Sequence, residues 1–210
     1  KCLVGLLEVD SGHIIFNERN FSEMNLKERR LIRNEIGMLF QGSALFDYLT
    51  VEENVMFPLN MLTSQTIEEK RERVNFCLQR VNLINVEKLK PSEISGGMKK
   101  RVAIARAIAL NPKYLFCDEP NSGLDPITSI LIDNLISEIT KEFQMTTVIN
   151  THDMNSVVEI GDKIAFLYKG KLWWEGSNKE ILNTKNKEIN DFVYATELLR
   201  KLKSNPDIIK

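Results

Sequence analysis

The sequence has few cysteines, and they are far apart. Cys2, Cys77 and Cys117 are the only three in 210 residues, and two of them lie in apolar runs. A disulfide framework would need more cysteines, and a structural zinc site would need clustered cysteine or histidine ligands. We therefore expect reduced thiols and a cytoplasmic protein.

Strong net charge and long apolar runs are also missing. The chain has 28 Lys and Arg against 29 Asp and Glu, so its net charge is -1 and does not indicate a nucleic-acid or anionic membrane partner. No apolar run approaches the ~20 residues that span a bilayer, and the start does not resemble a signal peptide. With 43% hydrophobic and 27% charged residues, the composition is typical of a single soluble globular domain.

The strand and helix patterns that are present alternate along the chain. Short apolar runs at Ile36–Gln41, Tyr114–Asp118 and Met145–Thr151 predict buried parallel strands, with a helix from Pro126 to about Glu142 between the last two. This alternation predicts an α/β fold with a mostly parallel sheet flanked by helices.

One stretch interrupts the alternation, because no strand pattern occurs between Thr50 and Lys90. Thr50 begins a predicted helix that Pro58 ends at about Phe57, and Thr66 begins another that runs to about Leu83. We predict an inserted helical subdomain here. The other predicted elements are half a helix at Lys1–Leu7, a strand at His13–Phe16, and helices at Leu26–Asn34 and Met154–Ile160. A hairpin of Lys163–Tyr168 with Lys171–Trp174 and helical segments from about Asn178 and Glu188 complete the set.

Two adjacent carboxylates, Asp118 and Glu119, follow the apolar run that begins at Tyr114. At a strand end, one carboxylate can hold a magnesium ion, which prefers oxygen ligands. The other can orient or deprotonate a water for in-line attack on phosphorus. The alternative is a pair of solvated loop carboxylates.

A serine and two glycines, Ser95-Gly96-Gly97, precede an apolar helix pattern. A helix N-terminus favours an anion, and glycines let the backbone approach a phosphate closely. The alternative is a plain turn with a helix cap. We interpret the next three basic residues, Lys99 to Arg101, as a solvated face.

Two further side chains follow apolar strands. Gln41 ends one at the rim where open α/β sheets bind ligands, or it satisfies loose backbone groups. His152 follows another and could sense a terminal phosphate, or it is a lone capping histidine.

Taken in order, these motifs resemble the nucleotide-binding domain of an ABC transporter over essentially the whole chain. The matching motifs are the Q-loop (Gln41), the family signature (Ser95–Met98), the Walker B strand (Tyr114–Glu119), the D-loop (Ser122–Asp125) and the switch histidine (His152). The resemblance implies one P-loop NTPase-like domain. Its expected parts are a core at about 1–49 and 111–176, a helical subdomain at about 50–110 and a C-terminal helical extension at about 177–210.

The resemblance also implies ATP and Mg²⁺ as cofactors. Asp118 would help hold magnesium through water, with Gln41 coupling the metal site to the helical insert. Glu119 would polarise the attacking water, and His152 would contact the γ-phosphate.

A second copy is implied as well, because the signature would grip the ATP of another subunit. Ser95 and the amides of Gly96 and Gly97 would bind that ATP in a head-to-tail dimer, with Asp125 communicating across it. The signature here reads Ile94-Ser95-Gly96-Gly97-Met98 instead of Leu-Ser-Gly-Gly-Gln, but the residues that would touch phosphate are intact.

Met98 and the stretches Phe40–Phe46 and Asn54–Leu59 resemble the Mla-type ATPases, which serve lipid transport between bacterial membranes. This likeness implies a homodimer on the cytoplasmic face of the inner membrane, with permease subunits, a lipid-binding partner and no nucleic acid. Two alternatives are a soluble ABC-type ATPase of translation or DNA repair, and a truncated assembly subunit without hydrolysis.

The Walker A motif Gly-x-x-x-x-Gly-Lys-Ser/Thr does not occur in the 210 residues. In the family this loop precedes a helix that ends like Cys2–Leu7, so we expect ~30 or more upstream residues that also supply the adenine-stacking aromatic. By itself the printed chain is expected to bind ATP poorly and to hydrolyse little of it.

Overall fold

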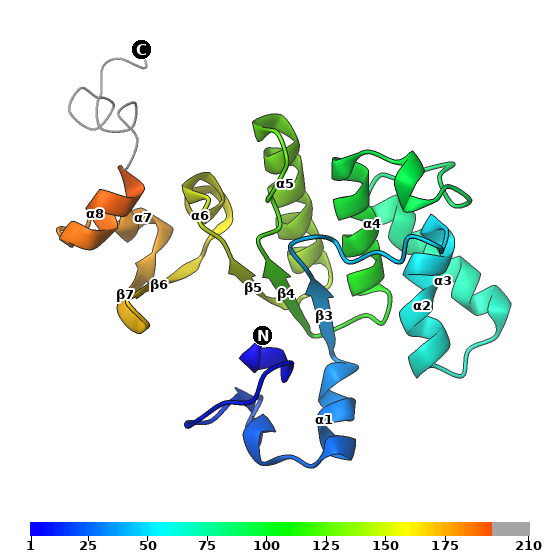
Figure 1. Cartoon of the computed structure of the whole chain (residues 1–210), viewed down its shortest axis with the longest axis horizontal. Coiled ribbons are helices and arrows are strands. Elements are labelled where there is room, and N and C mark those ends of the chain that lie inside the picture. Colours follow the sequence, from blue (N-terminus) through cyan, green and yellow to red (C-terminus); the bar gives the residue numbers. More distant parts are fainter. Residues whose placement is uncertain (195–210) are drawn as a thin grey trace. The chain divides into compact units, whose positions relative to one another are not determined.

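The computed structural model describes residues 1–194. The chain divides into two compact units, Lys1–Asn150 and Thr151–Lys210, which are described in turn (Figure 1). The predicted C-terminal extension beyond residue 194 lies outside the described residues.

The first unit contains a small hairpin, a three-stranded sheet and five α-helices. The strands are β1 (Ile15–Phe16), β2 (Arg19–Asn20), β3 (Ile36–Leu39), β4 (Tyr114–Asp118) and β5 (Thr146–Asn150). The helices are α1 (Leu26–Arg33), α2 (Val51–Leu62), α3 (Ile67–Arg80), α4 (Gly96–Ile108) and α5 (Pro126–Glu142), with 3₁₀ turns at Cys2–Val4, Phe21–Glu23 and Pro91–Glu93.

The three-stranded sheet confirms the predicted α/β fold. Its order is β3-β4-β5, both pairings are parallel, and Figure 1 shows the strands side by side. Leu39 pairs with Cys117, and Asp118 pairs with Asn150. All three strands therefore end at the same edge of the sheet, which is where open α/β sheets place ligands.

The helices follow the predicted caps, with one correction. Thr50 forms the predicted capping box with Glu53, but α2 continues through Pro58 to Leu62. A proline removes only one helical hydrogen bond, and the next residue, Leu59, is buried in the core that α2 shares with α3 and α4. Burial of this face outweighs the local cost, so the prediction that Pro58 ends the helix was wrong.

Two other predicted helices are shorter in the structure. Lys1–Leu7 forms a single 3₁₀ turn at Cys2–Val4, because Gly5 adopts a left-handed φ of 69° there. The second helix of the insert ends at Arg80 instead of about Leu83, and Asn82 just beyond it has a φ of 54°. A residue in this conformation cannot continue an α-helix.

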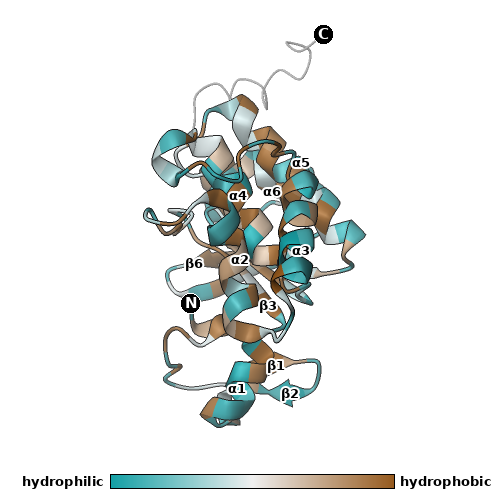
Figure 2. Cartoon of the chain, turned by 90° about the vertical axis from the view of Figure 1, so that its right-hand side faces the viewer, coloured by the Kyte–Doolittle hydropathy of each residue, from teal (hydrophilic) through white to brown (hydrophobic). Residues whose placement is uncertain are grey.

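One continuous core joins α2, α3, α4 and α5 to β3 and β4. Figure 2 shows that α3 carries mostly hydrophilic residues, and it contributes Val74, Cys77 and Leu78 to the core. At Gly37 the sheet and α4 approach so closely that a Cβ would lie 2.5 Å from the carbonyl oxygen of Ala107. The position of α4 relative to β3 is therefore fixed by backbone contact.

An ion pair ties the small hairpin to the start of β3 and makes stability depend on pH. Arg19 donates two hydrogen bonds to Glu35, at 2.9 and 2.8 Å, and these bonds hold the pKa of the Glu35 carboxyl below its usual range. Because the folded pKa is the lower one, the stabilisation is present above pH ~4.5 and is lost as the pH falls through the folded pKa.

We expect Glu35→Gln to lower the free energy of unfolding at pH 7 by about 1 kcal/mol or less, since the pair is partly exposed. The difference from wild type should shrink as the pH is lowered toward 3. Urea melts of both proteins at several pH values measure it. A difference that stays constant with pH would contradict the assignment.

The second unit consists of α6 (Met154–Ile160), β6 (Lys163–Tyr168), β7 (Lys171–Ser177), α7 (Asn178–Ile181) and α8 (Lys187–Val193). β6 and β7 form the predicted antiparallel hairpin, with β7 extending beyond Trp174. Its small core contains Ile181, Ile189 and Val193. Among the described residues, no helix combines the length and the hydropathy that crossing a membrane would require.

Candidate functional site

Polar side chains gather where β3, β4 and β5 end. Asp118 is the last residue of β4, and its Oδ1 accepts a hydrogen bond from Asn150 Nδ2 at 2.9 Å. Asn150 ends the neighbouring strand β5, so the parallel register brings the two together. Sequence reasoning missed Asn150, although its place at a strand end beside that of Asp118 was a usable signal. The amide fixes the direction of the Asp118 carboxylate.

Glu119 lies just past the strand end in an unusual backbone conformation. Its φ is 49°, in the left-handed region that costs energy for a residue with a Cβ. The backbone is held on both sides, because its N–H donates to the Asn150 carbonyl at 2.8 Å and its carbonyl accepts from Ser122 N–H at 3.2 Å. This conformation turns the chain so that Glu119 and Asp118 do not simply alternate across the sheet.

Gln41 follows β3 at the same edge. Its Nε2 donates to Ser122 Oγ at 3.3 Å, so the side chain contacts the loop after Glu119. With the amide nitrogen directed at Ser122, the amide oxygen is available as a ligand for a cation. The structure therefore brings Gln41 close to the loop that follows Glu119, so both can belong to one site at this edge of the sheet.

The interpretation of Lys99 to Arg101 as a solvated face was wrong for Lys100. We expected a solvated face, but Lys100 is only 4% exposed. Its ammonium donates to the carbonyl of Gln41 and, at 3.4 Å, to that of Glu119. Burial lowers the pKa of Lys100. Helical spacing offered a usable signal, because Lys100 lies three and four residues before the buried Ala103 and Ile104. Its acceptors left none, because they are backbone carbonyls of distant loops.

The start of α4 is built as predicted. Ser95 is the N-cap, and its Oγ accepts from the backbone N–H of Met98 at 3.2 Å. The two glycines differ. A Cβ on Gly97 would lie 2.8 Å from Thr128 Cγ2, whereas a Cβ on Gly96 would meet only Leu124 Cδ2 at an ordinary 3.8 Å. The packing of α4 on α5 thus disfavours a side chain at position 97, but it leaves room for one at position 96.

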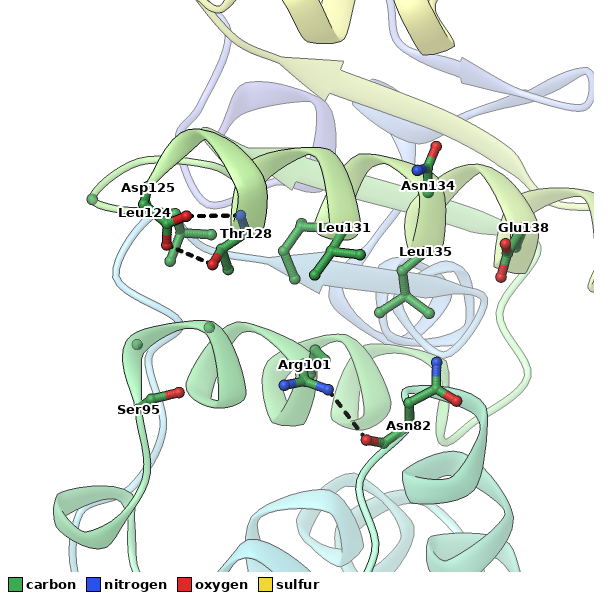
Figure 3. A pocket seen from close by; sticks show the side chains of 14 residues that line it. Asn82, Ser95, Arg101, Leu124, Asp125, Thr128, Leu131, Asn134, Leu135 and Glu138 are labelled. Atoms are coloured by element: carbon green, nitrogen blue, oxygen red, sulfur yellow. Dashed lines mark hydrogen bonds between the residues drawn. The ribbon is translucent and has the colours of Figure 1, made fainter.

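A groove of about 550 Å³ runs from the signature between α4 and α5. In Figure 3, Ser95 and Arg101 lie on the α4 side of this groove. Thr128, Leu131 and Leu135 lie on α5 and point toward α4. The backbone of Gly96 and Gly97 lines one end of this groove. The signature is therefore open to a ligand along that end.

Asp125 lies across the groove from the signature and caps α5. Its carboxylate accepts from Thr128 N–H at 3.0 Å and from Thr128 Oγ1 at 2.5 Å (Figure 3). These bonds hold the pKa of Asp125 below its usual range. Its communication across a dimer remains a prediction.

The contact between Gly97 and Thr128 gives a sharp test of how α4 and α5 pack. We expect Gly97→Ala to lower the free energy of unfolding by about 1–3 kcal/mol, because the added methyl overlaps the Thr128 methyl. In a Thr128→Ser background the same change should cost less than about 0.5 kcal/mol, since serine keeps the hydroxyl and lacks the methyl. Denaturant melts of the double-mutant cycle measure the coupling, and purely additive effects would refute the contact.

His152 belongs to the second unit. It is exposed and precedes Asp153, which caps α6 through Asn155 N–H at 2.9 Å. The predicted contact of His152 with the γ-phosphate therefore remains a prediction.

The donor set at the sheet edge suits magnesium. Across residues 1–194 there is no cluster of three or more His, Cys, Asp or Glu side chains that could hold a metal ion. Magnesium is bound through one or two protein oxygens and keeps several waters, so such a cluster is not needed. The oriented Asp118 carboxylate and the Gln41 amide oxygen are hard ligands of the appropriate kind.

Comparison with known proteins identifies the family of the chain. The ABC transporter family matches residues 1–122. The chain is 36% identical over its whole length to a methionine import ATP-binding protein, MetN, of Clostridioides difficile, and spans 62% of that protein. It is also 36% identical to a probable ribonucleotide transport ATP-binding protein, mkl, of Mycobacterium leprae, with 92% of this chain and 56% of the relative covered.

Solved structures give the same result. The dimeric ATP-binding cassette MJ0796, in a post-hydrolysis state with ADP and Pi, superimposes with a TM-score of 0.76 and 32% identity. The match covers 84% of this chain and 78% of that one. The chain therefore belongs to the ABC transporter family, as an ATP-binding domain.

Proposed function

We propose that the protein containing this chain hydrolyses ATP in a head-to-tail dimer and powers a membrane transporter. The observation that carries the proposal is the sheet edge, where Asn150 orients Asp118 and Gln41 reaches the loop after Glu119. An oriented carboxylate, a second carboxylate and an amide at one edge fit magnesium-assisted phosphoryl transfer to water.

In this proposal the two carboxylates have different tasks. Magnesium, when bound, would neutralise charge on the phosphate oxygens, and Asp118 would hold it through water with Gln41. Glu119 would orient a water and accept its proton as the water oxygen bonds to the γ-phosphorus. The bond from phosphorus to the bridging oxygen breaks, and ADP and phosphate leave. His152 would donate to the γ-phosphate.

The signature would serve the ATP of a second subunit. Gly96 supports this role because the fold itself leaves room for a side chain there, so the glycine suits a ligand that approaches the backbone. Ser95 and the amides of Gly96 and Gly97 would bind phosphate at the α4 N-terminus. Asp125, across the groove, would link this half-site to the opposite subunit.

We further propose a lipid as the transported substrate, with permease subunits and a lipid-binding protein as partners, at the cytoplasmic face of a bacterial inner membrane. The support is the Mla-type pattern at Met98, Phe40–Phe46 and Asn54–Leu59. The relatives with printed substrates concern methionine and ribonucleotides, so a small polar substrate is the alternative. Co-purification with a permease would favour a transporter over a soluble ABC-type ATPase of translation or DNA repair.

The test of the proposed function compares two proteins. We expect the full-length protein to show magnesium-dependent ATPase activity, and the 210-residue chain to remain near background because its sequence contains no Walker A motif. Phosphate release measures both. Robust turnover by the 210-residue chain would overturn the second expectation. Absence of turnover by the full-length protein with its permease would overturn the proposed function and favour an assembly subunit.

A further inference from the structure

Lys100 places a buried positive charge between the two loops that carry the proposed chemistry. It lies in α4, just after the signature that begins this helix. Its ammonium donates to the carbonyl of Gln41, in the loop after β3, and to the carbonyl of Glu119, in the loop after β4. One side chain therefore bridges the backbones of the two residues whose side chains would face the metal and the attacking water.

These loops need such support because their backbones are strained. Glu119 has a φ of 49°, and Ser43 and Ala44 have φ values of 63° and 48°. Left-handed residues with a Cβ persist only where surrounding contacts hold them. Arg106, further along α4, donates to the carbonyls of Ser43 and Ala44, each at 2.7 Å. The cations of α4 thus hold the loop after β3 at three carbonyls.

The ammonium of Lys100 is buried, and it donates hydrogen bonds to two backbone carbonyls. A cation buried at such a site must be stabilised by hydrogen bonds. The backbone carbonyls of Gln41 and Glu119 supply them.

We propose that Lys100 is a positioning residue for ATP hydrolysis, which fixes the Gln41 and Glu119 backbones and thereby sets where the amide and the carboxylate lie. The inference rests on the proposed function. It adds that α4, which would bind the partner's ATP at its first turn, also holds the residues that act on the subunit's own ATP.

The kinetic test uses the full-length protein with Lys100→Met, Lys100→Arg and, as the matched control, Lys99→Met. Lys99 is the neighbouring lysine and is only partly buried. We expect Lys100→Met to lower kcat about tenfold or more, with the KM for ATP within about twofold, because misplaced groups slow the chemical step and not binding. Lys100→Arg should recover part of kcat, and Lys99→Met should match wild type.

Several results would overturn the inference. Lys100→Met with kcat within twofold of wild type would do so, as would a loss that appears equally in Lys99→Met. A loss that Lys100→Arg does not relieve would indicate a packing role only. If wild type turns over and Glu119→Gln does not, while Lys100→Met is normal, the proposed function stands and this inference fails.

A second measurement does not depend on turnover. The amide of Ser43 donates to the Phe40 carbonyl, and the amide of Ser122 donates to the Glu119 carbonyl, so both report the order of the two loops. We expect hydrogen exchange at both amides to be faster in Lys100→Met and unchanged in Lys99→Met. Unchanged exchange at both amides in Lys100→Met would overturn the inference even if the protein hydrolysed no ATP. Should Lys100→Met fail to fold, the same comparison is made with Lys100→Leu, which is also neutral and cannot donate.

Discussion

Replacing Glu119 with glutamine is expected to lower kcat of the full-length protein by a factor of about 10²–10⁴, while ATP still binds. Glutamine keeps the size of the side chain and its backbone contacts to Asn150 and Ser122, but it cannot accept a proton from water. Single-turnover phosphate release measures the chemical step, and nucleotide titration measures binding. The expected split is a large loss in kcat with a Kd for ATP within about threefold of wild type.

Glu72→Gln is the matched control for this loss. Glu72 is an exposed carboxylate on α3, away from the sheet edge, and its replacement removes the same charge. It should leave kcat unchanged. If Glu119→Gln retained more than about a tenth of the wild-type kcat, Glu119 would not be the group that activates water.

In the full-length protein, Gly96→Ala is expected to reduce ATPase activity about 100-fold without reducing the stability of the fold. The Cβ would meet only Leu124 Cδ2 at 3.8 Å, so the fold accommodates it. A phosphate that must approach the backbone of α4 would be displaced by a distance of the order of an ångström, which is enough for a loss of this size. Phosphate release and a thermal melt of the Gly96→Ala variant give the two numbers.

The comparison with Gly97→Ala makes the Gly96 result specific. At position 97 the same methyl overlaps Thr128, so stability should fall there and recover with Thr128→Ser. Gly96→Ala should melt at the wild-type temperature or above, because alanine favours helix over glycine. A destabilised Gly96→Ala variant, or a stable one with full activity, would contradict the phosphate-binding role.

The parts of the site that depend on local pattern could be predicted from the sequence. The cap at Ser95, the strand end at Asp118 and the helix from Pro126 to Glu142 all agree with the structure. A few consecutive residues determine each of these features: a capping side chain, an apolar run or a first-turn proline. The parallel sheet followed from their alternation with helices.

The parts that depend on distant partners could not be predicted. Helix α2 continues through Pro58 because Leu59 is buried in the core that α2 shares with α3 and α4. Asn150 orients Asp118 only because their strands are neighbours in register. Lys100 lies three and four residues before the buried Ala103 and Ile104, but only the tertiary fold brings two carbonyls to its ammonium.

The left-handed residues at the catalytic edge have a consequence for engineering the protein. Ser43, Ala44 and Glu119 each occupy a backbone region that costs about 1–2 kcal/mol for a residue with a Cβ. A search for thermostable variants would select glycine or asparagine at these positions. At Ser43 and Ala44 the protein can tolerate such variants. At Glu119 the substitution that raises the melting temperature would also remove the carboxylate. Selection for thermostability alone would therefore favour variants of this protein that are more stable and inactive.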